Sequence, residues 1–131
     1  MKKANFFMEE YRLWIAKAED DLNWAKQSIK SRIFYGACFA AQQAAEKALK
    51  AFLIKHNKPL VKIHDLNALL ENCIKIDREF DTVRHSVEVL FPYYVETRYP
   101  FSGDLVAFGS SDADEALLEA SEIIEFVKKK L

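Results

Sequence analysis

The sequence predicts an all-α protein, an antiparallel up-down bundle of four to five helices that forms a single domain over residues 1–131. Half of the 131 residues are hydrophobic, which is enough to build a core, while glycine and proline number only three each. An all-β domain would need many more turn residues. Long stretches place apolar side chains three or four residues apart, and the links between most of these stretches are short.

The first helix is expected from about Glu9 to Lys30, and its acidic residues should fall on the other faces, including Asp21. Its apolar positions recur at helical spacing: Tyr11, Trp14, Ala18, Leu22, Ala25 and Ile29. A second helix is expected from about Arg32 to His56. Its apolar stripe is wide and rich in small residues, which predicts a central helix with close neighbours on several sides.

Three further helices follow from the same periodicity. They are expected at Leu66–Ile76 with Asp65 as N-cap, at Arg78–Phe91, and from Asp112 to Lys130 with Ser111 as the cap. The segment 91–111 has no clear period, apart from a possible short helical turn through Tyr94. It carries several aromatic residues: Tyr93, Tyr94, Tyr99 and Phe101. These residues either fill the end of the bundle or form a surface for a dimer or partner.

Charge is balanced overall but unevenly distributed. The net charge is −1, yet residues 22–64 hold eight basic residues and one acid, and residues 101–127 hold seven acids and no base. This asymmetry indicates either functional charged faces or two solvated faces that neutralise each other in the bundle.

Several classes of protein are disfavoured. The two cysteines, Cys38 and Cys73, lie in apolar patterns without a CxxC or Cys/His cluster, so we expect buried thiols and no metal or cofactor. No apolar run approaches the roughly 20 residues of a membrane span. The amino-terminal residues are too polar for a signal peptide, so a cytoplasmic location is expected.

The stretch FYGACFAAQQAAEKALKAFL, residues 34–53, resembles the second helix of the HEPN family. Neighbouring features occur in the family's order. His64-Asp65-Leu66 is similar to the family's entry to the next helix, and Thr97-Arg98-Tyr99-Pro100 resembles the Arg-Tyr-Pro segment of one branch. The similarity covers nearly the whole chain.

The resemblance implies a helical bundle that pairs into a homodimer and acts with a small nucleotidyltransferase. Other family members are toxin ribonucleases, in which an Arg and a His a few residues later cut RNA at the dimer cleft. Such cleavage needs a base for the 2′-hydroxyl and a cation for the charged transition state. No His follows Arg98 in that window, and the formal match in this chain is Arg78 with His85. On one α-helix these two would share a face. Alternatively, they make surface contacts with neighbouring acids such as Asp77, Asp81 or Glu88.

A second set of candidates would bind an anion. Gln43, Lys47 and Lys50 lie on one face of the second helix, and the lysines suit a phosphate. Arg98 could grip a phosphate bidentately, and Tyr99 or Tyr94 could stack on a base. His64 lies at a helix start, where backbone amides also favour anions. The alternatives are an ordinary Glu46–Lys50 surface pair, solvated lysines, and a His64 that only supports the turn.

Taken together, the sequence predicts a non-catalytic HEPN-type module with nucleotide or RNA as its candidate ligand. It would act with a nucleotidyltransferase in a toxin–antitoxin-like system, as a homodimer and away from membranes. Two alternatives stay open: a metal-independent ribonuclease toxin, and a structural adaptor that docks through its acidic last helix.

Overall fold

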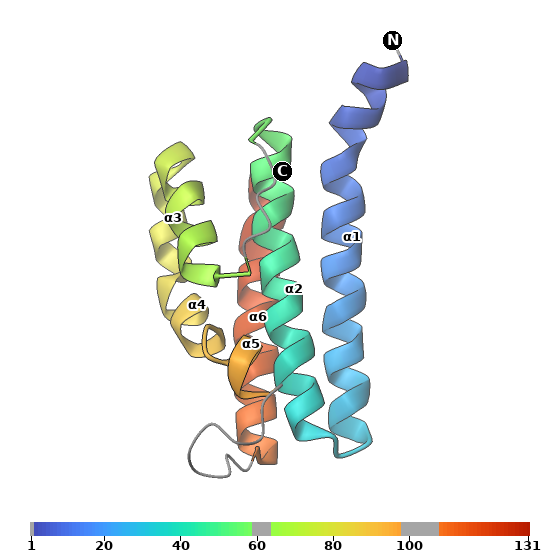
Figure 1. The fold of residues 1–131 in the computed structure, drawn as a ribbon, viewed down its shortest axis with the longest axis vertical. Coiled ribbons are helices and arrows are strands. Elements are labelled where there is room, and N and C mark those ends of the chain that lie inside the picture. The colour runs from blue at the N-terminus through green and yellow to red at the C-terminus, as the bar shows by residue number, and fades with distance from the viewer. Residues whose placement is uncertain (1, 59–63, 98–107) are drawn as a thin grey trace.

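The computed structural model describes residues 2–58, 64–97 and 108–131, with side chains from Glu10 onward. The described chain is all-helical, which confirms the predicted fold class. Its elements, in order, are α1 (Lys2–Lys30), α2 (Phe34–Lys55), α3 (Leu66–Ile76), the 3-10 helix η1 (Arg78–Val83), α4 (Arg84–Leu90), α5 (Tyr93–Glu96) and α6 (Ser110–Lys130). The long helices α1 and α2 run antiparallel, and α6 returns beside them (Figure 1).

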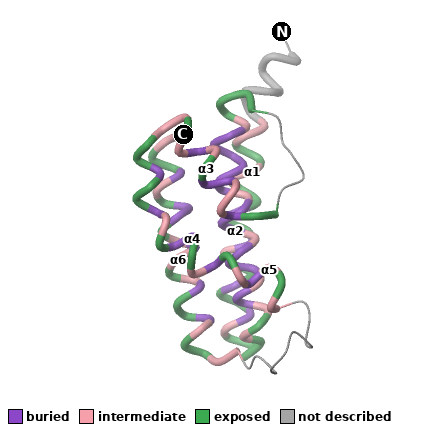
Figure 2. The backbone as a smooth tube through the Cα atoms, turned by 60° about the vertical axis from the view of Figure 1, so that its left-hand side comes forward, coloured by how far each residue is buried: buried purple, intermediate pink, exposed green. Residues whose placement is uncertain are grey.

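Helix α2 is the centre of the bundle, as its wide apolar stripe predicts. It packs against α1, α3, α4, α5 and α6. Seven of its alanines are fully buried, and such small side chains let the neighbouring helix axes approach closely. Buried stretches of backbone follow the sides of the helices that face one another (Figure 2).

Large apolar side chains fill the space between α2, α6 and the α3–α4 layer. Phe80 on η1 lies at the middle of this region and is fully buried. Its ring centroid is 4.3 Å from that of Phe52 on α2 and 5.0 Å from that of Phe126 on α6. One side chain therefore ties three elements together.

Some helix ends match the sequence prediction and others differ. Asp65 caps α3 as predicted, because its Oδ1 accepts the Ala68 N–H at 3.1 Å. Helix α1 begins at Lys2, ahead of the expected Glu9. The cap of α6 is Gly109 rather than Ser111, because the Asp112 carboxylate reaches back to accept the Gly109 N–H at 2.9 Å.

The expected single helix over 78–91 is two pieces, a 3-10 helix followed by a short α-helix. Asp77 is extended, with φ −144°, and its carboxylate accepts the Glu79 N–H at 3.0 Å. That side-chain bond favours a tight turn over a regular α-helical start. The short turn α5 carries Tyr94, as the sequence suggested.

The two cysteines are free and buried, as predicted. Burial raises the pKa of the Cys38 and Cys73 thiols to about 12. Such thiols stay protonated at neutral pH and are poor nucleophiles. In the part of the chain that the structure describes, no helix is long and apolar enough to cross a membrane.

Candidate functional site

Glu46 on α2 is the centre of a buried polar cluster. Its side chain is only 4% exposed. Oε2 accepts from Lys50 Nζ at 2.8 Å and lies 3.1 Å from His64 Nδ1, while Oε1 accepts from Gln42 Nε2 at 3.5 Å. Gln42, Glu46 and Lys50 meet because residues four apart lie on one helix face. The buried carboxylate therefore has a polar partner on each oxygen.

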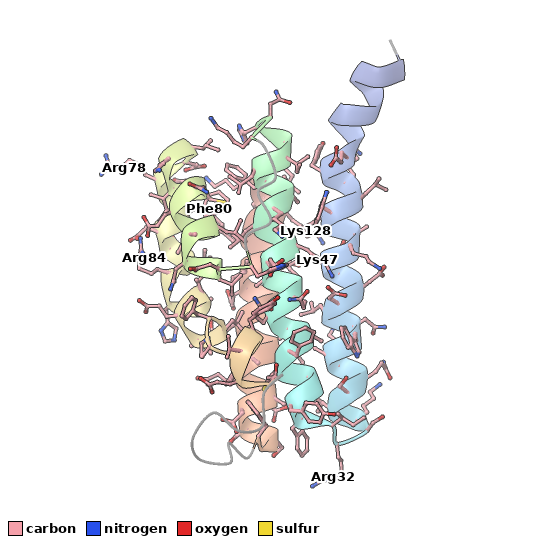
Figure 3. All side chains as sticks on the ribbon, viewed as in Figure 1. Arg32, Lys47, Arg78, Phe80, Arg84 and Lys128 are labelled. Atoms are coloured by element: carbon pink, nitrogen blue, oxygen red, sulfur yellow. The ribbon has the colours of Figure 1, made fainter. Side chains whose placement is uncertain are left out.

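Helix α1 completes this cluster from the other side. The Trp14 ring lies over Lys50, with Nζ 5.8 Å from the ring centroid, which adds a cation–π contact. One turn away, Lys47 (Figure 3) forms an ion pair with Asp21 of α1. Asp21 is buried, so the expectation that it falls on another face of α1 is wrong. The sequence missed this because Asp21 pairs with a residue 26 positions away.

The predicted ligand residues of α2 are thus engaged within the protein. Lys47 and Lys50 each contact a carboxylate, and Gln43 Nε2 donates to Gln42 Oε1 at 2.7 Å. A phosphate on this face would have to compete with Asp21 and Glu46 for the two ammonium groups.

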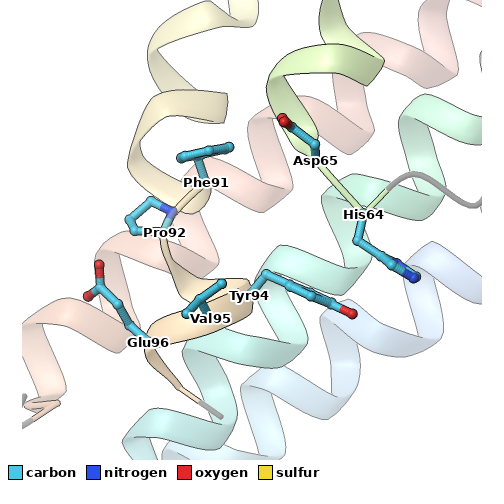
Figure 4. A pocket seen from close by; sticks show the side chains of 7 residues that line it. All are labelled: His64, Asp65, Phe91, Pro92, Tyr94, Val95 and Glu96. Carbon is cyan, nitrogen blue, oxygen red and sulfur yellow. The ribbon is translucent and has the colours of Figure 1, made fainter. Parts of the chain in front are cut away.

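His64 joins the start of α3 to α5 as well as to α2. Its ring stacks on Tyr94 with centroids 5.0 Å apart and an interplanar angle of 9° (Figure 4). Half of the His64 side chain is exposed. Contacts with both Glu46 and Tyr94 are those expected of a residue that supports the turn, while the exposed half leaves room for a ligand.

An aromatic row continues from Tyr94 across α2 to α1. The Tyr94 and Phe39 ring centroids are 6.4 Å apart, and the Phe39 and Trp24 centroids are 6.1 Å apart. Trp24 is 47% exposed. The row thus spans α5, α2 and α1. Phe39 and Trp24 are not apparent as functional candidates from the sequence, because neither belongs to the main apolar stripe of its helix.

The neighbouring aromatic residue, Tyr93, belongs to the core. It is buried and packs on Phe108 with ring centroids 6.0 Å apart. Burial, followed by the charges of nearby groups, raises the pKa of its phenol to about 12. Of the two interpretations of the aromatic segment, filling of the bundle therefore holds for Tyr93, whereas Tyr94 lies in the half-exposed row. Tyr99 and Phe101 lie outside the described residues, as does Arg98.

The pair Arg78 and His85 does not share an α-helical face. The backbone is 3-10 up to Val83 and α-helical from Arg84, so the seven-residue offset does not correspond to two α-helical turns. Arg78 extends away from the bundle (Figure 3). His85 Nε2 is instead 3.9 Å from Glu119 Oε2 of α6. Two of the three local acids suggested as alternative partners have other contacts, since Asp81 pairs with Arg84 and Asp77 with Lys130.

In residues 10–58, 64–97 and 108–131, no three His, Cys, Asp or Glu side chains gather as metal ligands. The charged contacts around Glu46 and the aromatic row together connect α1, α2, the start of α3 and α5. We refer to Gln42, Glu46, Lys50 and His64 below as the Glu46 cluster.

The fold is that of a known class of helical protein. The HEPN domain matches residues 11–130, so the chain is a member of the HEPN family, as its second helix predicted. It is 28% identical over 141 residues to a Methanocaldococcus jannaschii protein named "Putative toxin MJ1304", covering 98% of this chain and 92% of that protein.

Two solved structures share the fold. TT1696 from Thermus thermophilus has 31% sequence identity and a TM-score of 0.83, over 95% of this chain and 100% of that chain. ST0689, an archaeal HEPN homologue, has 28% identity and a TM-score of 0.76, over 94% of this chain and 98% of that chain. The agreement spans nearly the full length of all three chains.

Proposed function

We propose that this protein is a non-catalytic HEPN module that acts with a nucleotidyltransferase in a toxin–antitoxin-like system. Membership of the HEPN family supports the class of module, and the name of the Methanocaldococcus jannaschii relative supports the toxin-like setting. The nucleotidyltransferase and a homodimeric working unit come from the family resemblance alone, so both are part of the proposal.

The observation that favours a binding module over a ribonuclease is that the two candidate catalytic side chains lie apart and do not face one site. Arg78 and His85 diverge at the junction of η1 and α4, and His85 faces Glu119. A cleavage centre needs its base and its cation around one phosphate. Lys47 and Lys50 stand beside carboxylates that would compete with such a phosphate.

The main test is co-expression with the product of the neighbouring gene. We expect a nucleotidyltransferase that co-purifies with the chain, and a growth defect from one component that the pair relieves. Size-exclusion chromatography with light scattering should show a dimer of the chain. Failure to recover any complex, together with normal growth in every combination, would contradict the proposal.

A cleavage assay separates the module from the ribonuclease. Purified protein is incubated with tRNA at high concentration, alongside the His85→Ala variant. We expect no cleavage that depends on His85. Cleavage by the wild type that His85→Ala abolishes would replace the proposed module with an enzyme. Calorimetry with ATP and short RNAs then tests whether the isolated chain carries the ligand site.

A further inference from the structure

Large apolar side chains that are exposed or partly exposed form one surface across α1, α2, α5 and the turn before α5. We call this surface the aromatic face, and its members are Trp24, Tyr35, Phe39, Phe91, Tyr94 and Val95. The row from Trp24 through Phe39 to Tyr94 is its middle. Tyr35 lies one helical turn before Phe39 on α2 and so extends the same side of that helix.

The two ends of the aromatic face carry opposite charges. Beyond Tyr94 the face ends in a pocket of about 440 Å³ between the start of α3 and the turn that joins α4 to α5 (Figure 4). The lining is His64, Asp65, Phe91, Pro92, Tyr94, Val95 and Glu96. Asp65 and Glu96 make this end acidic. At the other end, the turn before Tyr35 carries Lys30 and Arg32, which are both exposed, and Arg32 extends from the end of the bundle (Figure 3).

The area of the aromatic face suits a protein interface. Trp24, Tyr35 and Phe91 are 47%, 57% and 42% exposed. Because an aromatic side chain buries about 150–250 Å² when it is fully covered, the whole face offers roughly 400–500 Å² of apolar surface. A standard interface covers about 800 Å² on each partner, and about 65% of that area is apolar in homodimers. The face is therefore large enough to form most of the apolar part of such an interface.

The distribution of charge favours a second copy of this chain as the occupant. In a two-fold symmetric pair the same surface lies on both copies, so each end of that surface meets its opposite end on the other copy. With the axis near Phe39, the basic turn of one copy lies against the acidic pocket end of the other. A nucleic acid fits less well, because the carboxylates of Asp65 and Glu96 repel phosphates.

We infer that the aromatic face joins two copies of this chain about a two-fold axis near Phe39, with aromatic side chains at the centre and opposite charges at the two ends. The inference rests on the proposed function, because the homodimer is part of that proposal. It adds which surface pairs and by what chemistry. The stack of His64 on Tyr94 then has a purpose in the pair, since it fixes the α5 part of the face to the bundle.

The direct test is sedimentation equilibrium of the purified chain and of its Trp24→Ala and Tyr35→Ala variants. Each substitution removes an exposed ring from the aromatic face, so we expect a wild-type dimer whose dissociation constant rises about tenfold or more in each variant. Leu118→Ala on α6 removes a similarly exposed apolar side chain outside the face and should leave the constant unchanged. Circular dichroism confirms that the variants fold. A wild-type dimer that neither ring substitution weakens, or that Leu118→Ala weakens as much, would overturn the inference.

Charge reversal tests the two-fold arrangement separately from the apolar contact. Arg32→Glu makes both ends of the face acidic, and Glu96→Lys adds a cation at the pocket end, so each should weaken the dimer by about threefold to tenfold at low salt. The double variant has opposite charges at the two ends again and should recover most of the lost affinity. Glu88→Lys on α4, outside the face, is the control and should have no effect. Single variants that weaken the dimer without recovery in the double variant would contradict the pairing of unlike ends.

The outcomes also separate this inference from the proposed function. A wild-type chain that is monomeric at every concentration removes the homodimer from the proposed function and the inference with it. If the Trp24→Ala and Tyr35→Ala variants stay dimeric but no longer bind the nucleotidyltransferase, the aromatic face belongs to that protein. The inference then fails while the proposed function stands.

Discussion

The two sides of α2 make different kinds of contact. The side that faces α1 carries two charge pairs, Lys47 with Asp21 of α1 and Lys50 with Glu46 within α2. Toward α3, η1 and α6 the contacts are apolar and aromatic, with Phe52 against Phe80. Apolar burial contributes directly to stability, whereas the desolvation of a buried ion pair largely offsets its Coulomb attraction. The comparison indicates that the side toward α3, η1 and α6 stabilises the fold by apolar burial alone, whereas the side toward α1 adds to its buried alanines a charged cluster that positions His64 and, through it, Tyr94.

The apolar side is tested by Phe80→Ala. This substitution removes the ring that lies between Phe52 and Phe126 and leaves a cavity, so we expect a loss of about 3–5 kcal/mol in the free energy of unfolding. Urea denaturation followed by circular dichroism measures it. Leu118→Ala, at a side chain that is 58% exposed, is the control and should change stability by no more than about 0.5 kcal/mol. A loss below about 1 kcal/mol for Phe80→Ala would show that the aromatic contacts do not dominate the fold.

The charged side is tested by Glu46→Gln. The substitution keeps the size of the side chain but leaves the buried Lys50 ammonium without its counter-charge. We expect a loss of about 2–3 kcal/mol, less than for Phe80→Ala because the amide oxygen still accepts a hydrogen bond. The His64 imidazole resonances should also move in the NMR spectrum, because His64 loses its carboxylate partner.

A double substitution separates the charge pair from simple packing. Glu46→Gln with Lys50→Met removes both charges. The loss in the free energy of unfolding should be clearly smaller for this double variant than the sum of the losses for the two single variants. Strict additivity of the single losses would mean that Lys50 and Glu46 act independently. The division of α2 into a stabilising side and a positioning side would then lose its basis on the charged side.

The fold was predictable from the sequence because its signals are local. Helical spacing of apolar residues and the Asp65 cap act over a few residues, and α3 has the predicted ends, Leu66 and Ile76. The predicted helix ends and helix types are wrong where tertiary or side-chain contacts determine the local structure. Asp112 moves the cap of α6 to Gly109, and Asp77 starts a 3-10 helix where the apolar pattern alone predicts an α-helix.

The candidate site was predictable only in part. The sequence places Gln43, Lys47 and Lys50 on one face of α2, but it cannot show that Asp21 of α1 comes to meet Lys47. It also treats Glu46 as one half of a surface pair, because nothing local reports that α1 and His64 cover this carboxylate. The pocket beside Asp65 and Glu96 needs residues from two separate elements, so periodicity along one helix cannot reveal it.

The smallest effect is expected at a partly exposed counterpart of the buried pairs, where Lys130 of α6 contacts Asp77 at 2.9 Å. The hydrogen bond from Lys130, followed by the backbone bond from Glu79, lowers the pKa of the Asp77 carboxyl below its usual value. A carboxyl with a lowered folded-state pKa contributes stability above the unfolded-state pKa, and this contribution is lost as the pH falls through the folded-state pKa.

Asp77→Asn should therefore reduce the melting temperature slightly at pH 7, and the difference from the wild type should vanish in acid, where the wild-type carboxyl is itself neutral. Added salt should also shrink the difference, because the contact is solvent-accessible. Thermal unfolding from pH 7 down to pH 2 measures this, with Glu122→Gln on the exposed side of α6 as the control. For the buried Glu46, by contrast, salt should change the stability loss caused by Glu46→Gln very little, because buried pairs are screened much less. Equal salt sensitivity at the two sites would show that the Glu46 cluster is open to solvent, and the positioning role assigned to it would have to be abandoned.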